Sequence, residues 1–237
     1  MAATGDRRIH TVLGMHRSGT SMLTGSLQEK GLELGDVNEA ADFNKKGNRE
    51  NPVVRDIHDR VLARSGGAWD DVPAEIVWPP GPLQRLRTFI ESMNARYDRW
   101  GFKDPRTVLV LDGWRRLVPE GLACVGVYRH PRSVARSLAN RLPMPVDQGI
   151  ALWRAYNGRL IAEHRREGFP ILRFDTDPDR LRRDIEVVAR TWALPEASKP
   201  STFFDSQLRH HDADMSTDIP DSCRDAWDYL EAHRLTP

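Results

Sequence analysis

Short apolar runs alternate with longer amphipathic segments along the 237-residue chain. The runs are rich in β-branched residues, as buried strands are, whereas the longer segments carry apolar residues three or four positions apart, which predicts helices. This alternation indicates an α/β fold in which helices flank a mostly parallel central sheet. The predicted strands are Ile9–Leu13, Trp100–Lys103, Leu122–Tyr128 and Phe169–Phe174. The predicted helices are Thr20–Lys30, Asn51–Ala63, Leu83–Arg96, Val108–Leu117, Arg132–Leu142, Val146–Glu167, Asp179–Trp192 and a short Asp225–His233.

Length and composition fit a single domain of residues 1–237, with the tail from about residue 196 packing on it or capping it. The formal net charge of +1 argues against general nucleic-acid binding. The first ten residues lack the apolar core of a signal peptide, and no apolar run is long enough to span a bilayer. Two cysteines, Cys124 and Cys223, give neither a disulfide framework nor a metal signature. We therefore expect a cytoplasmic protein without a nucleic-acid partner or a membrane span.

The segment Gly14–Leu23 joins the first predicted strand to the first predicted helix through a glycine-containing turn. Such a turn exposes backbone N–H groups, and the helix N-terminus adds a partial positive charge, so the segment predicts a phosphate-binding loop. The pattern for nucleoside triphosphates places a lysine after its second glycine. Here Thr20 follows Gly19, and the cation is Arg17, two residues before that glycine. The loop therefore suits an anion other than a magnesium-bound triphosphate.

Polar clusters follow three of the predicted strands, namely His16–Ser18, Lys103–Arg106 and Arg129–Arg132. In parallel sheets, ligands bind beyond the carboxyl ends of the strands. Because these ends share one edge of the sheet, we expect the three clusters to form a single anion-binding crevice.

Two of these motifs, in their order and spacing, resemble those of bacterial sulfotransferases that use 3′-phosphoadenosine 5′-phosphosulfate (PAPS). The segment His16–Ser21 is similar to the 5′-phosphosulfate loop of that family, in which a lysine or arginine precedes Ser-Gly-Thr. The segment Tyr128–Ser137 is similar to the 3′-phosphate motif, in which a strand-end arginine precedes a helical serine by eight residues. The resemblance covers most of the chain and implies the P-loop-like fold of these enzymes.

The resemblance also implies a division of roles. Arg17 would grip the 5′-phosphosulfate beside the amides of the loop and stabilise the bridging oxygen as the product, 3′-phosphoadenosine 5′-phosphate (PAP), leaves. Arg129 and Ser137 would hold the 3′-phosphate, to which the arginine offers a rigid fork of donors. No metal is expected. The implied donor-binding residues are His16, Arg17, Ser18, Gly19, Thr20, Ser21, Arg129 and Ser137.

Glu50 is the candidate general base that takes the acceptor proton. It lies in Asn44–Asn51, which looks like an N-x-x-G-x-x-E-N segment of bacterial and carbohydrate-acting relatives. A second interpretation makes Glu50 a first-turn charge that interacts with the helix dipole. The alternative base is His58, eight residues further on, because both residues can face one side of a helix.

The cluster Lys103–Arg106 resembles a Lys-Asp-Pro-Arg segment of the same relatives. Arg106 could touch sulfate or substrate, and Asp104 could orient Arg17 or Arg106; a salt-bridged turn explains the segment equally well. The C-terminal Arg-Lys-Gly-type loop of some sulfotransferases is missing, and Arg209–His211 is a weak substitute. We interpret His210–Asp214 as a solvated loop rather than a metal site.

These patterns favour a sulfotransferase that moves a sulfuryl group from PAPS to a hydroxyl or amine of a small molecule, sugar or glycolipid. Its acceptor pocket would be built from the polar loop 35–47 and the irregular segment 66–82, where Phe43, Trp69 and Trp78 either line the pocket or anchor the loops. A P-loop small-molecule kinase is disfavoured by Thr20 and by the lack of a magnesium-binding aspartate after a strand. A non-catalytic nucleotide-binding module is the third alternative.

Overall fold

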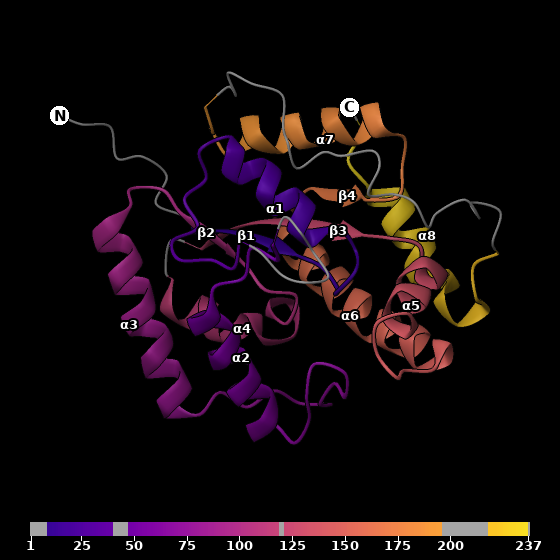
Figure 1. Ribbon diagram of the computed structural model, residues 1–237, viewed down its shortest axis with the longest axis horizontal. Helices are drawn as coiled ribbons and strands as arrows, with labels where there is room; N and C mark the ends of the chain where they lie inside the picture. Colours follow the sequence, from indigo (N-terminus) through magenta and orange to yellow (C-terminus); the bar gives the residue numbers. More distant parts are fainter. Residues whose placement is uncertain (1–8, 40–46, 119–120, 196–217, 237) are drawn as a thin grey trace.

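A computed structural model describes residues 9–39, 47–118, 121–195 and 218–236. Its centre is a parallel sheet of four strands in the order β2-β1-β3-β4 (Figure 1). In the register, Leu13 of β1 lies opposite Gly126 of β3, and Val12 opposite Lys103 of β2. Every residue of β1 and β3 is buried, because helices cover both faces of the sheet. The strands are β1 (Ile9–Leu13), β2 (Gly101–Lys103), β3 (Leu122–Tyr128) and β4 (Ile171–Arg173).

The predicted α/β fold is confirmed, and the helices lie close to their predicted positions. The third helix starts earlier than expected because Pro80 suits a first helical position, and the fifth ends at Ala139 rather than Leu142. The helices are α1 (Thr20–Glu29), α2 (Pro52–Arg64), α3 (Pro80–Arg96), α4 (Thr107–Leu117), α5 (Pro131–Ala139), α6 (Val146–Glu167), α7 (Pro178–Thr191) and α8 (Arg224–His233), with a 3₁₀ turn, η2 (Asp221–Cys223).

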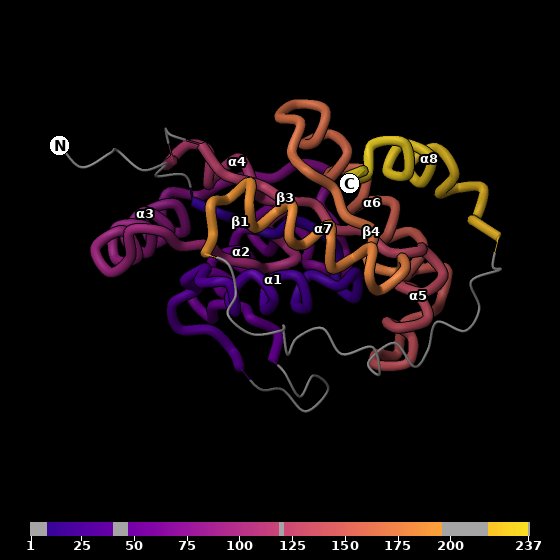
Figure 2. The backbone as a smooth tube through the Cα atoms, turned by 90° about the horizontal axis from the view of Figure 1, so that it is seen from above, coloured from indigo at the N-terminus to yellow at the C-terminus, as the bar shows by residue number. Residues whose placement is uncertain are grey.

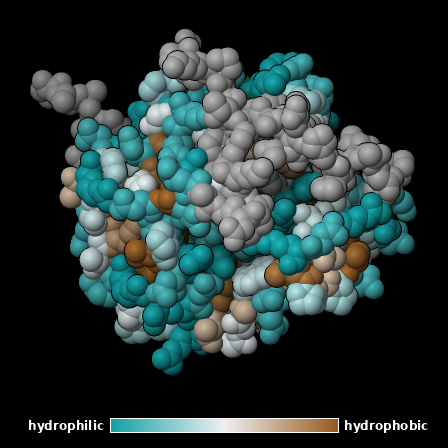
Figure 3. All heavy atoms as spheres, viewed as in Figure 1, coloured by the Kyte–Doolittle hydropathy of each residue, from teal (hydrophilic) through white to brown (hydrophobic). Residues whose placement is uncertain are grey.

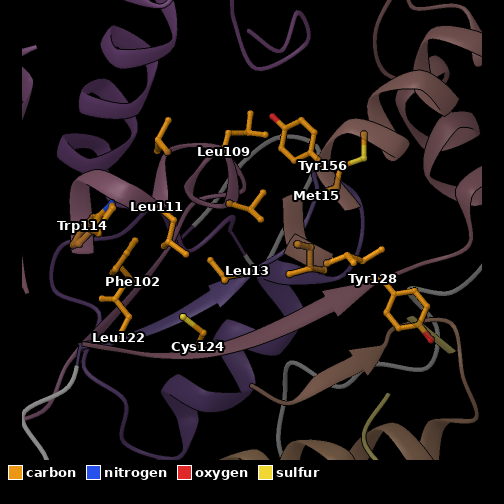
Figure 4. Close-up of a cluster of buried hydrophobic side chains, with 14 of the residues drawn as sticks. Leu13, Met15, Phe102, Leu109, Leu111, Trp114, Leu122, Cys124, Tyr128 and Tyr156 are labelled. Carbon is orange, nitrogen blue, oxygen red and sulfur yellow. The ribbon is translucent and has the colours of Figure 1, made fainter. Parts of the chain in front are cut away.

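Two apolar cores lie on opposite faces of the sheet. Helices α1 and α7 cover one face, where Leu23 and Leu27 meet Val125 of β3; α7 runs along this side of the strands in Figure 2. Helices α2, α4 and α6 cover the other face in Figure 1. There Trp114 stacks on Phe102 with ring centroids 3.7 Å apart, in the cluster that Figure 4 shows. Packing on both faces holds the strands in position, and with them the strand ends that carry the polar clusters.

The C-terminal helix α8 is joined to the ends of β3 and β4 by side-chain contacts. The Tyr128 hydroxyl donates to Glu231 Oε1 at 2.7 Å, and Arg173 Nη1 donates to the same oxygen at 3.1 Å. Arg173 also lies over the ring of Trp227. The tail beyond residue 217 therefore supports the strand end that precedes Arg129.

Large apolar side chains that are exposed are few in the described part of the chain, namely Val53, Val77 and Val146. On the face seen in Figure 3, hydrophilic residues predominate and apolar residues gather in small groups. None of the described helices is long and apolar enough to cross a membrane.

Candidate functional site

The three polar clusters meet at one edge of the sheet, as predicted for the carboxyl ends of parallel strands. Arg17, after β1, donates from Nε to Ser137 Oγ on α5 at 2.8 Å. Arg129, after β3, donates from Nη1 to the Arg17 carbonyl oxygen at 3.2 Å. Lys103, at the end of β2, donates from Nζ to Ser21 Oγ on α1 at 3.2 Å. The residues assigned to the two phosphate motifs thus touch one another.

The loop between β1 and α1 depends on glycine at its end. Gly19 has a φ of 89°, and a Cβ there would lie 2.1 Å from the ring of Phe174. Arg17 also adopts a positive φ, of 66°, which is uncommon for a residue with a side chain. Helix α1 has neither a side-chain N-cap bond nor an acidic residue in its first turn. Its first N–H groups are therefore available to a bound anion.

Positive charge is concentrated around Arg17. Burial lowers the pKa of Arg17, and the nearby charges of Arg141 and Arg129 lower it further. An arginine remains charged even so, and an anion placed among these residues would relieve the repulsion. Sequence reasoning missed Arg141, which lies in the turn just beyond the end of α5.

Glu50 lies beside Lys103 at the entrance of α2. Lys103 Nζ is 2.9 Å from Glu50 Oε1, and the side chains of the two residues are 1% and 13% exposed. Helix α2 begins at Pro52 with Asn51 as its N-cap, so Glu50 precedes the helix and the first-turn interpretation is wrong. Sequence reasoning proposed Glu50 but not its pairing with Lys103, since no local pattern joins residues 53 positions apart.

Backbone contacts hold Glu50 in place. The Asn38 N–H donates to the Glu50 carbonyl oxygen, and the Arg49 N–H donates to the Asn38 carbonyl oxygen, both at 3.1 Å. Gly47 has a φ of 73°, and a Cβ there would collide with the Asn38 carbonyl. The Ser21 hydroxyl donates to the Asn48 carbonyl oxygen at 3.1 Å, which ties this segment to α1. In the N-x-x-G-x-x-E-N segment, the backbone conformation at Gly47 therefore requires glycine, and the backbone of Glu50 is fixed by its hydrogen bond with Asn38.

His58 lies in the core rather than at an open surface. Its Nε2 accepts the indole N–H of Trp114 at 2.9 Å, so the ring proton lies on Nδ1, which faces Asp104 Oδ1 at 3.4 Å. Burial alone would raise the pKa of Asp104, but the hydrogen bond to His58 and the charge of Arg106 hold it below its usual value. Both nitrogens of His58 therefore face core partners.

Asp104 and Arg106 form the salt-bridged turn that was one of the two interpretations of this segment. Asp104 accepts from the Arg106 N–H at 2.8 Å and from its Nη1 at 3.1 Å. The guanidinium also lies 2.6 Å from Asp59 through Nε. Asp104 therefore orients Arg106, and its carboxylate is engaged inside the core.

His16 connects the loop to the irregular segment 65–79. Its ring packs on Trp69 with centroids 4.6 Å apart, and Tyr156 donates its hydroxyl to the Trp69 carbonyl at 2.8 Å. Within the described residues, the buried Nε2 of His16 has no hydrogen-bond partner. Burial, followed by the charge of Arg106, lowers the pKa of His16 to about 3, so the ring is neutral at neutral pH.

The aromatic residues of the two loops divide into different roles. Trp78 is buried, donates from Nε1 to the Val110 carbonyl at 3.2 Å, and fills the space over Gly113, so it anchors the segment. Trp69 is half-buried, packs against the core and contacts the His16 ring. Phe43 lies outside the described residues.

A hollow of about 280 Å³ opens beside Glu50. It is lined by Asp36, Val37, Asn38, Glu50, Pro52 and Arg55. Its walls combine carboxylates, an amide and a guanidinium with a larger share of apolar surface.

No cluster of three or more metal-binding side chains occurs in the described ranges. Arg209–His211 and His210–Asp214, which sequence reasoning considered, lie outside the described residues, as do Asn44–Lys46.

Neither a family model nor a curated protein sequence matches the chain. Among solved structures, the sulfotransferase domain of the olefin synthase of Synechococcus PCC 7002 matches 97% of the chain and 96% of its own length, with a TM-score of 0.54 at 14% identity. The sulfotransferase STF1 of Mycobacterium tuberculosis matches 94% of the chain and 71% of its own length, with a TM-score of 0.45 at 14% identity, too weak to compare folds. The chain therefore has the fold of a sulfotransferase domain, as the resemblance of its motifs implied.

Proposed function

We propose that the chain, acting as one domain, is a sulfotransferase that moves a sulfuryl group from PAPS to a hydroxyl or amine and releases PAP. The observation that carries this proposal is the contact between Arg17, Ser137 and Arg129 at the mouth of the loop. It supports two anion sites side by side, as a ligand with a 5′-phosphosulfate and a separate 3′-phosphate requires. The fold shared with a sulfotransferase domain supports the same conclusion.

On the donor side, the loop amides from Ser18 to Ser21 and the Arg17 guanidinium would bind the 5′-group, with His16 behind them. Arg129 and Ser137 would bind the 3′-phosphate through charge-assisted and neutral hydrogen bonds. As the bond between sulfur and the bridging oxygen breaks, negative charge develops on that oxygen. A fixed cation at this position, which we assign to Arg17, stabilises the transition state more than the ground state.

On the acceptor side, Glu50 would accept the proton of the attacking hydroxyl or amine while the new bond to sulfur forms. A positioned base of this kind contributes a factor of about 10²–10⁴ to the rate. His58 is a poorer candidate because its nitrogens face Trp114 and Asp104. The hollow beside Glu50, whose lining is more apolar than polar, supports a small-molecule acceptor that presents both polar and apolar surface.

The test compares the thermal stability of the protein with PAP and with ATP plus magnesium. A ligand at one hundred times its Kd stabilises the native state by about 2.7 kcal/mol, which corresponds to a rise in melting temperature of about 5–10 °C for a chain of this size. We expect that rise with PAP in the presence of EDTA and little change with ATP plus magnesium. The reverse result would favour the kinase and exclude the sulfotransferase.

A further inference from the structure

Lys103 is a buried ammonium shared between the loop and the candidate base. Its side chain is 1% exposed, and Nζ donates to both Glu50 Oε1 at 2.9 Å and Ser21 Oγ at 3.2 Å. Ser21 lies in the first turn of α1, whose N-terminus closes the phosphate-binding loop. The ammonium therefore lies between the place where an anion would bind and the carboxylate that would act on the acceptor.

We propose that Lys103 is a donor-controlled switch on Glu50: the ammonium pairs with Glu50 until the sulfuryl oxygens of the donor compete for it, and only then is Glu50 released to act as a base. The inference rests on the proposed function. It assigns to Lys103 a regulatory step that couples arrival of the donor to readiness of the base.

The cost of burying charge explains why Lys103 needs a partner before the donor binds. A buried ammonium without a partner is strongly destabilising. The carboxylate of Asp104, the next residue in the sequence, already accepts from Arg106 and faces His58. In the described part of the chain, Glu50 is the carboxylate that pairs with Lys103. An ammonium is a compact charge with three donors on a flexible stem, so it can turn from one anion to another.

The switch would also let the site distinguish the donor PAPS from the product PAP. While Glu50 Oε1 is engaged by Lys103, the carboxylate is drawn toward the loop rather than toward the acceptor. A donor that carries the sulfuryl group supplies new oxygens near Ser21, whereas the product PAP lacks them. The base would therefore be free with PAPS and engaged again once PAP is left in the site.

The test is a comparison of the affinities for PAPS and PAP, measured by calorimetry without acceptor. If Glu50 competes with the sulfuryl group for Lys103, Glu50→Gln should increase the ratio Kd(PAP)/Kd(PAPS) at least about fivefold, because the rival anion is gone. Lys103→Met should lower the ratio toward one, and adding Glu50→Gln to Lys103→Met should change nothing further. The matched control is Glu186→Gln, which removes a similar lysine–glutamate pair, Lys30–Glu186, away from the site.

An unchanged ratio in Glu50→Gln, or an equal rise in the Lys103→Met background, would overturn the switch while leaving the proposed function intact. Failure of the wild-type protein to bind PAP would instead overturn the proposed function and the switch together. Circular dichroism would first verify that each variant is folded. If Lys103→Met does not fold, the response of Glu50→Gln against Glu186→Gln still decides the question.

Discussion

The donor side and the acceptor side of the crevice are built in different ways. On the donor side, Arg17 and Arg129 lie in the segments that follow two neighbouring strands, and backbone geometry at Gly19 shapes the loop. On the acceptor side, Glu50 precedes α2 and is held by Lys103 and by the backbone of Asn38, both far from it in the sequence. The donor side thus depends on the backbone at Gly19 as well as on its arginine side chains, whereas the acceptor side depends on a pair of side chains distant in the sequence. The two sides should therefore respond differently to mutation.

The largest effect should come from the acceptor side. Glu50→Gln is expected to lower kcat at saturating PAPS by about 10²–10⁴-fold, because the base that takes the acceptor proton is lost. PAP binding should persist, since the loop and Arg129 are unchanged. Steady-state assays with Glu186→Gln as control would measure this; a kcat close to wild type would remove Glu50 as the base.

The donor side should be most sensitive at its backbone. In Gly19→Ala, the new Cβ meets the Phe174 ring at 2.1 Å in a left-handed conformation, so we expect a loss of about 3 kcal/mol in folding stability together with weakened PAP binding. Gly158→Ala on α6 is the control, because a Cβ there meets nothing within 4 Å. Urea unfolding and calorimetry would measure both quantities. Wild-type PAP affinity in Gly19→Ala would show that the loop geometry is not needed.

A substitution of His58 tests whether this residue stabilises the fold or acts as the base. His58→Ala leaves the buried Trp114 N–H without a partner and removes the imidazole that faces the buried Asp104 carboxylate, which should cost about 2–3 kcal/mol of folding stability. The folded variant should keep a kcat within a few fold of wild type. A variant that is stable but inactive would instead make His58 the base.

The effect expected to be smallest at neutral pH is a pH dependence of stability at His16, which becomes large only in acid. Its pKa falls from 6.5 in the unfolded chain to about 3 in the folded one, so the unfolded state binds the proton more readily and stability should fall as pH drops from 6.5 toward 3. His16→Gln should reduce that fall by about 2.5 kcal/mol between pH 7.5 and 4.5, because roughly two pH units of the titration are removed at about 1.36 kcal/mol each. Urea unfolding at the two pH values would measure it, and parallel losses in both proteins would contradict the assigned burial of the ring.

The same contrast explains how much the sequence could predict. The strands and the donor motifs are local patterns, and the parallel strand order brings Arg17, Arg129 and Lys103 to one edge without further information. The Lys103–Glu50 pair, the Arg141 charge near Arg17 and the core position of His58 depend on packing between segments distant in the chain. Glu50 lies just before α2 because that helix begins at Pro52. Asn51, a favoured N-cap residue, and Pro52, a favoured first helical residue, indicate this start in the sequence.

The central claim is that the crevice binds a nucleotide through two separate anion sites. Its most direct test is the affinity for PAP against that for adenosine 5′-phosphate, which lacks the 3′-phosphate, measured by calorimetry in EDTA with wild type and Arg129→Ala. We predict that wild type binds PAP at least about tenfold more tightly, as expected for a charge-assisted contact of 1.5–3 kcal/mol, and that Arg129→Ala abolishes the preference. Equal affinities in wild type, or a preference that survives in Arg129→Ala, would contradict this account.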